Sequence, residues 1–175
     1  MPIGTFFAGV GALVWDPNSK TYLLLKRSMA KDFAAGAWEC VTGRVDQGEG
    51  FGEALHREVW EETGLTIEPI FVLGTTCFHR GEERPENELL GVVYYCTVVN
   101  TAGDTSQFKP EIHLSPEHDM YRWVSAEQAH EFLSVINSSE YWLLRVIERA
   151  EIVKQHLSGE MIDYFRHFGF DIDTI

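Results

Sequence analysis

Residues 43–65 read GRVDQGEGFGEALHREVWEETGL, a glycine-rich loop with acidic residues that passes into a glutamate-dense segment. Successive residues of a helix turn by about 100°, so Glu58, Glu61 and Glu62 fall within an arc of about 100° on one face. Like charges spaced this way repel by about 0.2–0.5 kcal/mol per pair in an isolated helix. Their placement beside a glycine loop makes sense if a divalent cation, or two, lies among them.

The same stretch carries start and stop signals for a short helix. Gly50 is a tolerable N-cap, and Gly64 is well placed to leave the helix in a left-handed conformation. The apolar stripe recurs at i, i+4 and i+8, with Phe51, Leu55 and Val59. We therefore predict a helix from near residues 50–52 to Gly64, preceded by a short strand at residues 38–42.

The composition indicates one folded domain with an acidic surface. The chain has 175 residues, of which 45% are hydrophobic and 13% aromatic, a composition unlike that of a disordered protein. The net charge of −13 argues against binding a nucleic acid polymer through a basic surface. Binding of small phosphorylated ligands stays possible, since bound metal ions can reverse the sign of the local electrostatic potential. With no basic-then-apolar leader and no run of about 18 apolar residues, we expect a cytoplasmic protein that binds no membrane.

Outside the acidic stretch, the sequence pattern mixes strands and helices without strict alternation. We predict further strands at residues 5–15, 22–25, 67–73, 75–79, 89–99 and 120–124. The first two should form a hairpin, and 89–99 should be central in the sheet. Helices are predicted at residues 125–136, 139–156 and 160–167, and loops at 80–88 and 100–110. This mixture indicates an α/β (α+β) fold with helices packed on a mixed β-sheet.

The stretch at 43–65 resembles the Nudix box of the Nudix hydrolase family. That box reads Gly, five residues, Glu, seven residues, then Arg-Glu-U-x-Glu-Glu-x-Gly-U, where U is a bulky aliphatic residue. Here Gly43 is followed by Glu49 and then by residues 57–65, so every specified position is met. Trp38 and residues 115–124 are similar to flanking segments of the family. The resemblance implies an α/β/α sandwich, with a Nudix domain at 1–136 and a helical extension at 137–175 packed on it.

Three positions near the box depart from the family pattern. The family usually has Pro-Gly-Gly at the entry, where this chain has Val41, Thr42 and Gly43. The acid three residues before the first box glutamate is Asp46 rather than Glu. None of these changes alters the charged residues of the box. The backbone carbonyl of Thr42 is present whatever the side chain at that position.

The resemblance implies a role for each charged residue of the box. The implied metal ligands are Glu58, Glu62, Glu61 and the carbonyl oxygen of Thr42, and the implied cofactor is Mg²⁺ or Mn²⁺. Such hard cations neutralise the phosphate oxygens and orient the attacking water. Arg57 would orient the carboxylates through an ion pair that could include Glu49. The plainer alternative is a solvated acidic face with surface ion pairs.

The base that deprotonates the water is left open among several carboxylates. The family resemblance offers a glutamate of the box, which here means Glu58 or Glu61, or an acid from a later loop. Glu117 matches the family's Glu-His position and is preferred over Glu88, which lies before the strong strand. Either of these later acids is equally well an ordinary surface carboxylate. The histidines show no zinc spacing and are expected to be structural or solvated: His56, His79 and His118.

Substrate contacts are harder to read from the residues. Arg27 could bind a phosphate as a bidentate donor, with a surface arginine as the alternative. Trp38, Phe78 or Tyr94 could stack on a base, although most aromatic residues of such a chain belong to the core.

The implied function is hydrolysis of a diphosphate linkage in a nucleoside diphosphate linked to another moiety. A nucleotide sugar or ADP-ribose, a (d)NTP and a dinucleoside polyphosphate all stay open as substrates. The proline signature of ADP-ribose hydrolases is missing, because the corresponding positions hold Arg80 and Gly81. The alternative function is a non-catalytic Nudix-fold domain that binds or senses a nucleotide. A homodimer through the last helices, which carry Tyr141 and Trp142, would be compatible with either.

Overall fold

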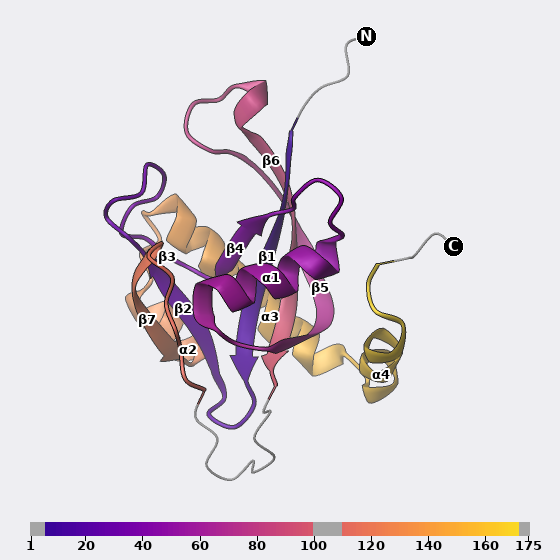
Figure 1. Ribbon diagram of the computed structural model, residues 1–175. Helices are drawn as coiled ribbons and strands as arrows, with labels where there is room; N and C mark the ends of the chain where they lie inside the picture. The colour runs from indigo at the N-terminus through magenta and orange to yellow at the C-terminus, as the bar shows by residue number, and fades with distance from the viewer. Residues whose placement is uncertain (1–5, 100–109, 172–175) are drawn as a thin grey trace.

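The computed structural model describes residues 6–99 and 110–171, and Figure 1 shows its elements. The strands are β1 (Phe7–Asp16), β2 (Thr21–Arg27), β3 (Trp38–Glu39), β4 (Val41–Arg44), β5 (Ile67–His79), β6 (Glu88–Val98) and β7 (His118–Val124). The helices are α1 (Phe51–Thr63), α2 (Ala126–Phe132), α3 (Ser138–His156) and α4 (Gly159–Phe168), with a 3-10 turn at Pro85–Asn87. The loop predicted at 100–110 lies almost wholly outside the described residues.

The strands form one mixed sheet whose main order is β3-β2-β1-β6-β5, with β4 paired to β1 and β7 to β2. The predicted hairpin of β1 and β2 is confirmed, since Trp15 lies antiparallel to Tyr22. The central position predicted for residues 89–99 is also confirmed, because β6 runs between β1 and β5 and is parallel to β1.

Two strand predictions were wrong. The single strand predicted at 38–42 is two strands, because β3 pairs with β2 and β4 pairs with β1. Residues 67–73 and 75–79 are a single strand, β5, which keeps its pairing with β6 across two register shifts at Pro69/Phe71 and Val72/Gly74. The irregularities allow proline and glycine in a strand that lies at the edge of the sheet.

Helices cover both faces of the sheet and form two cores. Figure 1 shows α1 in front of the sheet and α3 behind it. The α1 core joins Leu55 and Val59 to residues of β1, β2 and β6, among them Val10, Leu25 and Cys96. The α3 core joins Leu143 and Ile147 to Leu13, Leu24 and Tyr95. Because alternate residues of a strand point to opposite faces, the same strands supply both cores and build an α/β/α sandwich.

The predicted ends of α1 are confirmed. Gly50 is the N-cap, and Gly64 ends the helix with a φ of 71°. Since Gly50 has no capping side chain, one acid of the first turn and one acid near the C-terminus accept the N–H groups at the start of the helix. Glu53 accepts from the N–H of Gly50 at 3.0 Å, and Asp171 accepts from that of Gly52 at 2.8 Å. Both place negative charge at the positive end of the helix dipole, which fixes where the acidic face of α1 begins.

The C-terminal helices follow the predicted order with small differences. Ser125 caps α2 as expected, accepting from the N–H of Gln128 at 3.2 Å, but α2 ends at Phe132 rather than residue 136. The division at residue 136 stays a prediction. So does the homodimer, for which a monomer at micromolar concentration in sedimentation would be the contrary result. None of the described helices is long and apolar enough to cross a lipid bilayer.

Candidate active site

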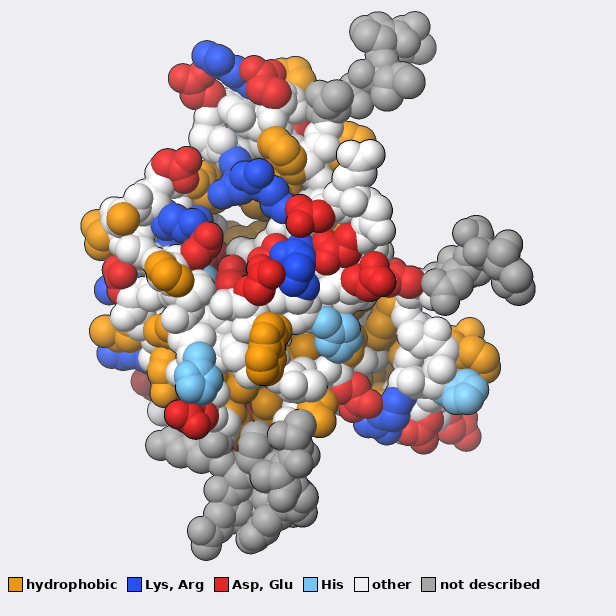
Figure 2. Space-filling model, viewed as in Figure 1, with side chains coloured by type: hydrophobic (Ala, Val, Ile, Leu, Met, Phe, Trp, Pro, Cys, Tyr) orange, Lys and Arg blue, Asp and Glu red, His pale blue; other side chains and the backbone are white. Residues whose placement is uncertain are grey.

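A cavity of about 360 Å³ opens beside the acidic face of α1, and we call it the charged cavity. Its acidic lining residues are Glu39, Asp46, Glu58, Glu62 and Glu117, and its basic ones are Arg27, Lys31, Arg44 and Arg80. Figure 2 shows acidic and basic side chains gathered around a hollow on this face of the molecule. The sequence therefore brings both signs of charge to one place, although the chain as a whole is strongly acidic.

Arg57 connects several of the carboxylates in and before α1 through hydrogen bonds. Its Nε and Nη2 donate to the carboxylate of Glu49, each at 2.8 Å, which is the ion pair expected from the box. Its Nη1 donates to Glu58 at 2.9 Å and to Glu61 at 3.3 Å, and its Nη2 also reaches the carbonyl oxygen of Arg44 at 2.9 Å. The hydrogen bond to Arg57 lowers the pKa of Glu49 to about 2. Arg57 thus ties the loop to the helix and fixes the Glu58 carboxylate.

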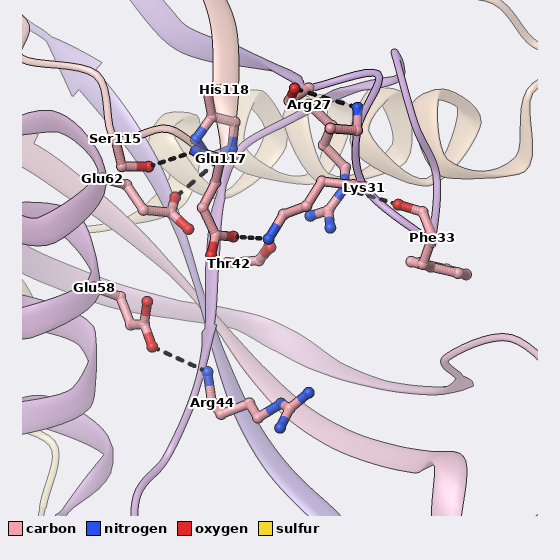
Figure 3. A network of polar contacts seen from close by, with 12 residues as sticks. Arg27, Lys31, Phe33, Thr42, Arg44, Glu58, Glu62, Ser115, Glu117 and His118 are labelled. Carbon is pink, nitrogen blue, oxygen red and sulfur yellow. Dashed lines mark hydrogen bonds and ion pairs between the residues drawn. The ribbon is translucent and has the colours of Figure 1, made fainter.

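Glu58 and Glu62 lie one turn apart on α1 and point into the charged cavity (Figure 3). Glu58 accepts from the backbone N–H of Arg44 at 3.1 Å, and burial raises the pKa of Glu58. Glu62 is buried, and its Oε2 has no hydrogen-bond partner among the described residues, although Nε2 of His118 lies 4.0 Å away. Burial first, then repulsion from Glu39, Glu58 and Glu117, raise the pKa of Glu62 well above its usual value. Burial of a polar group without a hydrogen-bond partner costs about 1–3 kcal/mol of stability, and more for a charged group. This oxygen is therefore a candidate for binding a ligand such as a metal ion.

A buried network that the sequence did not reveal lies beneath these two carboxylates. Glu39, from β3, accepts from Nη1 of Arg27 at 2.9 and 3.0 Å, and lies 2.9 Å from Nε2 of His118. Thr42 Oγ1 donates to the same carboxylate at 3.3 Å. The signal for Glu39 was strand alternation: Trp38 and Cys40 are buried in the α3 core, so Glu39 between them faces α1.

Some predicted residues meet in the charged cavity and others do not. Arg27 and Glu117 both line it, but Arg27 is buried and held by Glu39, and Glu117 is paired with Lys31 at 2.6 Å. The hydrogen bond from Lys31 lowers the pKa of Glu117. Glu61 is half exposed beside Arg57 and does not line the cavity. Glu88 is likewise absent from the lining and accepts from Sγ of Cys77.

The structure corrects the substrate role predicted for Trp38. The ring is buried in the α3 core, with its centroid 5.5 Å from that of Phe132, because Trp38 points to the face of β3 opposite Glu39. It lines neither the charged cavity nor the cavity described next. His118, predicted to be structural or solvated, is not solvated, because its side chain is only 1% exposed.

A second cavity of about 370 Å³, the aromatic cavity, adjoins the first and shares Phe33, Glu39 and Thr42 with it. The rings of Phe33 and Phe78 stack across 6.0 Å between centroids, with their planes only 14° apart. Phe78 was among the predicted stacking residues, whereas Phe33 came from a stretch predicted only as a loop. Tyr94 lies elsewhere, in a cavity beside α4.

Within residues 6–99 and 110–171, no three side chains of His, Cys, Asp or Glu form a cluster able to hold a metal ion. Two acids, Glu58 and Glu62, face the charged cavity from α1, and Thr42 of β4 lines it as well. Strand β4 approaches α1 so closely that a Cβ added at Gly43 would lie 1.8 Å from Cδ of Glu58. Glycine at this position is what lets the Glu58 carboxylate lie against the strand backbone.

Similarity to known proteins agrees with this geometry. An RNA pyrophosphohydrolase of Vibrio cholerae is 28% identical over 104 residues, which cover 55% of this chain and 60% of that protein. An octanoyltransferase of Myxococcus xanthus is 31% identical over 119 residues, covering 67% of this chain and 29% of that protein. The chain therefore spans less than two thirds of the length of these curated relatives.

Solved structures share the fold over most of the chain. A MutT protein from Methanosarcina mazei Go1 superposes with a TM-score of 0.65 at 28% identity, covering 86% of this chain and 99% of that one. The NUDIX domain of Shewanella oneidensis NrtR, solved with ADP ribose, superposes with a TM-score of 0.63 at 16% identity, covering 87% and 90%. The family model of the NUDIX domain matches residues 5–145, which is most of the chain. The chain therefore belongs to the Nudix family of hydrolases, as the box at residues 43–65 indicated.

Proposed function

We propose that this protein is a divalent-metal-dependent hydrolase that cleaves a diphosphate linkage in a nucleoside diphosphate derivative. One observation carries the proposal: the buried Glu62, whose Oε2 has no partner among the described residues, shares a cavity with Glu58 and with four cationic side chains. Carboxylates suit a hard cation, and arginine and lysine suit phosphate oxygens. A site with both is suited to a metal–diphosphate complex rather than to either component alone.

The residues fit Mg²⁺ or Mn²⁺. Glu58, Glu62 and the carbonyl oxygen of Thr42 would hold the ion, and all three supply the oxygen donors that hard cations prefer. Mg²⁺ is commonly bound by one or two carboxylates together with substrate phosphates, which suits a site without a three-acid cluster. When bound, the ion supplies charge neutralisation at the phosphate oxygens and lowers the pKa of a water molecule.

The protein's own residues then divide the remaining work. Arg57 holds the Glu58 carboxylate in place, and Glu61 supports Arg57 from outside the cavity. Glu117 is the preferred general base because it lines the charged cavity, whereas Glu61 and Glu88 do not. The hydrogen bond from Lys31 lowers the pKa of Glu117, which keeps the carboxylate ionised but makes it a weaker base. Arg27 acts indirectly, by fixing Glu39 beneath Glu62.

The adjoining cavities favour a nucleotide substrate. The charged cavity suits the diphosphate, and the aromatic cavity, with its parallel Phe33 and Phe78 rings, suits the flat face of a base. The fold is shared with proteins described as an Ap4A hydrolase of C. elegans and a UDP-X diphosphatase, and with the ADP ribose complex of NrtR. These neighbours define the panel to test rather than a single substrate.

The direct test is a screen of ADP-ribose, nucleotide sugars, (d)NTPs and dinucleoside polyphosphates with Mg²⁺ and with Mn²⁺. We expect at least one compound to be cleaved at its diphosphate linkage, read as released phosphates and nucleotides. Tight binding of panel members without any turnover would instead favour a non-catalytic nucleotide-binding domain.

Gly43→Ala should lower the activity of the site while the protein keeps its fold. The new methyl group would displace the Glu58 carboxylate, and a misplacement of about 1 Å at such a site lowers turnover by about 100-fold. Stability should fall only modestly, because the methyl group meets the side chain of Glu58 rather than backbone, and the loss is that of the hydrogen bonds to Arg57 and Arg44. The measurements are kcat and the unfolding temperature. Gly159→Ala is the matched control, since an added Cβ there meets no atom within 4 Å; unchanged turnover in Gly43→Ala would contradict the role of Glu58.

A further inference from the structure

Arg44 and Arg80 line the charged cavity without a carboxylate partner. Among the described residues, neither guanidinium has an Asp or Glu oxygen within 4.0 Å. The two other cations of the cavity are paired, Arg27 with Glu39 and Lys31 with Glu117. This contrast is informative because the chain has 27 acidic residues against 14 Lys and Arg, so acids are abundant. The unpaired arginines lie where an external anion would reach them.

The surroundings of Arg80 favour the arrival of an anion. Arg80 is half-buried, and burial first, then the charges of Arg44 and Arg27, lower its pKa. Its backbone is held by the β5–β6 hairpin, where its N–H donates to the carbonyl oxygen of Asn87 at 2.9 Å. A half-buried arginine on a backbone held by a hairpin, with two other arginines nearby, gains most from a multiply charged ligand placed among the guanidinium groups.

Arg44 approaches the same space from β4. Its backbone N–H is bonded to Glu58, while its side chain extends away from α1 (Figure 3). The planar fork of arginine matches phosphate oxygens in pairs, which a lysine cannot do. A carboxylate ligand would neutralise one arginine, whereas a diphosphate carries a charge on each phosphoryl unit and suits both.

We propose that Arg80 and Arg44 together bind the diphosphate of the substrate, on the side of the charged cavity away from α1. This inference rests on the proposed function for the identity of the ligand, and it adds Arg80 as a substrate-binding residue. The metal-binding carboxylates then come from α1, whereas the two arginines that contact the diphosphate come from β4 and from the end of β5. Substrates with a longer or more highly charged phosphate chain gain most from this pair.

The test uses imidodiphosphate, a diphosphate analogue that resists hydrolysis, titrated calorimetrically into the 175-residue protein with Mg²⁺ present. Arg80→Gln should weaken binding by about 10- to 100-fold, the effect of one charged hydrogen-bonding group. Arg84→Gln is the matched control, because Arg84 lies in the same hairpin, is paired with Glu82 and is absent from the cavity lining. It should bind within about twofold of the wild type.

Unfolding measurements separate a ligand-binding arginine from a structural one. At Arg80, burial and repulsion by Arg44 and Arg27 outweigh the attraction of Asp32 and Glu117, so the ligand-free Arg80→Gln protein should be at least as stable as the wild type. Wild-type affinity in Arg80→Gln, lost stability in that variant, or no imidodiphosphate binding by the wild type would each overturn the inference.

The same variants distinguish the two proposals. If the wild type binds imidodiphosphate through Arg80 but hydrolyses no panel compound, the inference stands and the proposed hydrolysis fails. If the wild type hydrolyses a panel compound and Arg80→Gln keeps the wild-type KM, the inference fails and the proposed hydrolysis stands.

Discussion

Glu62→Gln is expected to lower turnover by at least about 100-fold and to make the metal-free protein more stable at neutral pH. Loss of a residue that only supports a metal ligand lowers activity by about 10- to 100-fold, so loss of the ligand itself should exceed that. The gain in stability follows from burial, because a neutral amide replaces a carboxylate that lies near Glu39 and Glu58 and lacks a partner at Oε2. Opposite signs in turnover and stability are the mark of a functional residue.

The pH dependence of that gain has a definite sign. The folded protein raises the pKa of Glu62, whereas the unfolded chain has a value of about 4.3. Below about pH 4 the carboxyl is protonated in both states and the two proteins should differ little. Above the unfolded pKa the wild type loses stability as pH rises, until the folded pKa is passed, and the glutamine variant does not.

Unfolding temperatures of both proteins between pH 4 and pH 8, in chelator, measure this effect. Glu53→Gln is the matched control, since Glu53 lies on the same helix, caps Gly50 and is absent from the cavity lining. Near-normal turnover in Glu62→Gln, or lower stability at pH 7, would contradict the role of Glu62.

Removal of divalent cations should abolish hydrolysis, and Mg²⁺ or Mn²⁺ should restore it. The reason is the chemistry of the donors, two carboxylates and a backbone carbonyl, which suit hard cations. Mg²⁺ at about 100 times its dissociation constant should also raise the free energy of unfolding by about 2.7 kcal/mol. The measurements are turnover and unfolding in EDTA, with EDTA already saturated by Mg²⁺ as the control. Restoration by Zn²⁺ but by neither Mg²⁺ nor Mn²⁺ would rule out the oxygen-ligand site.

Local signals in the sequence were enough for the centre of the fold. The helix α1 was predictable because its caps, apolar stripe and box all lie within residues 43–65. The hairpin of β1 and β2 and the central β6 followed from turn residues and β-forming runs. The continuity of β5 did not follow, since Pro69 and Gly74 read as interruptions and only pairing with β6 carries the strand across them.

The site was predictable in detail where its residues are close in sequence, and Arg27 and Glu117 were the distant residues that were also expected there. The Glu49–Arg57 pair and the Glu58–Glu62 spacing could be read from the box. Glu39, Phe33 and Arg80 could not, because they reach the cavities from β3, a loop and the end of β5, and only the sheet topology brings them together. Trp38 was misassigned because a strand presents neighbouring residues to opposite faces, and the face of so short a strand is set by the tertiary fold.

Binding of Mn²⁺, followed by the loss of its free electron paramagnetic resonance signal, tests most directly whether Glu58 and Glu62 hold the metal. We predict that Glu58→Gln combined with Glu62→Gln raises the dissociation constant at least about tenfold, while Glu53→Gln leaves it unchanged. Equal Mn²⁺ affinity in the wild type and the double variant would contradict the account.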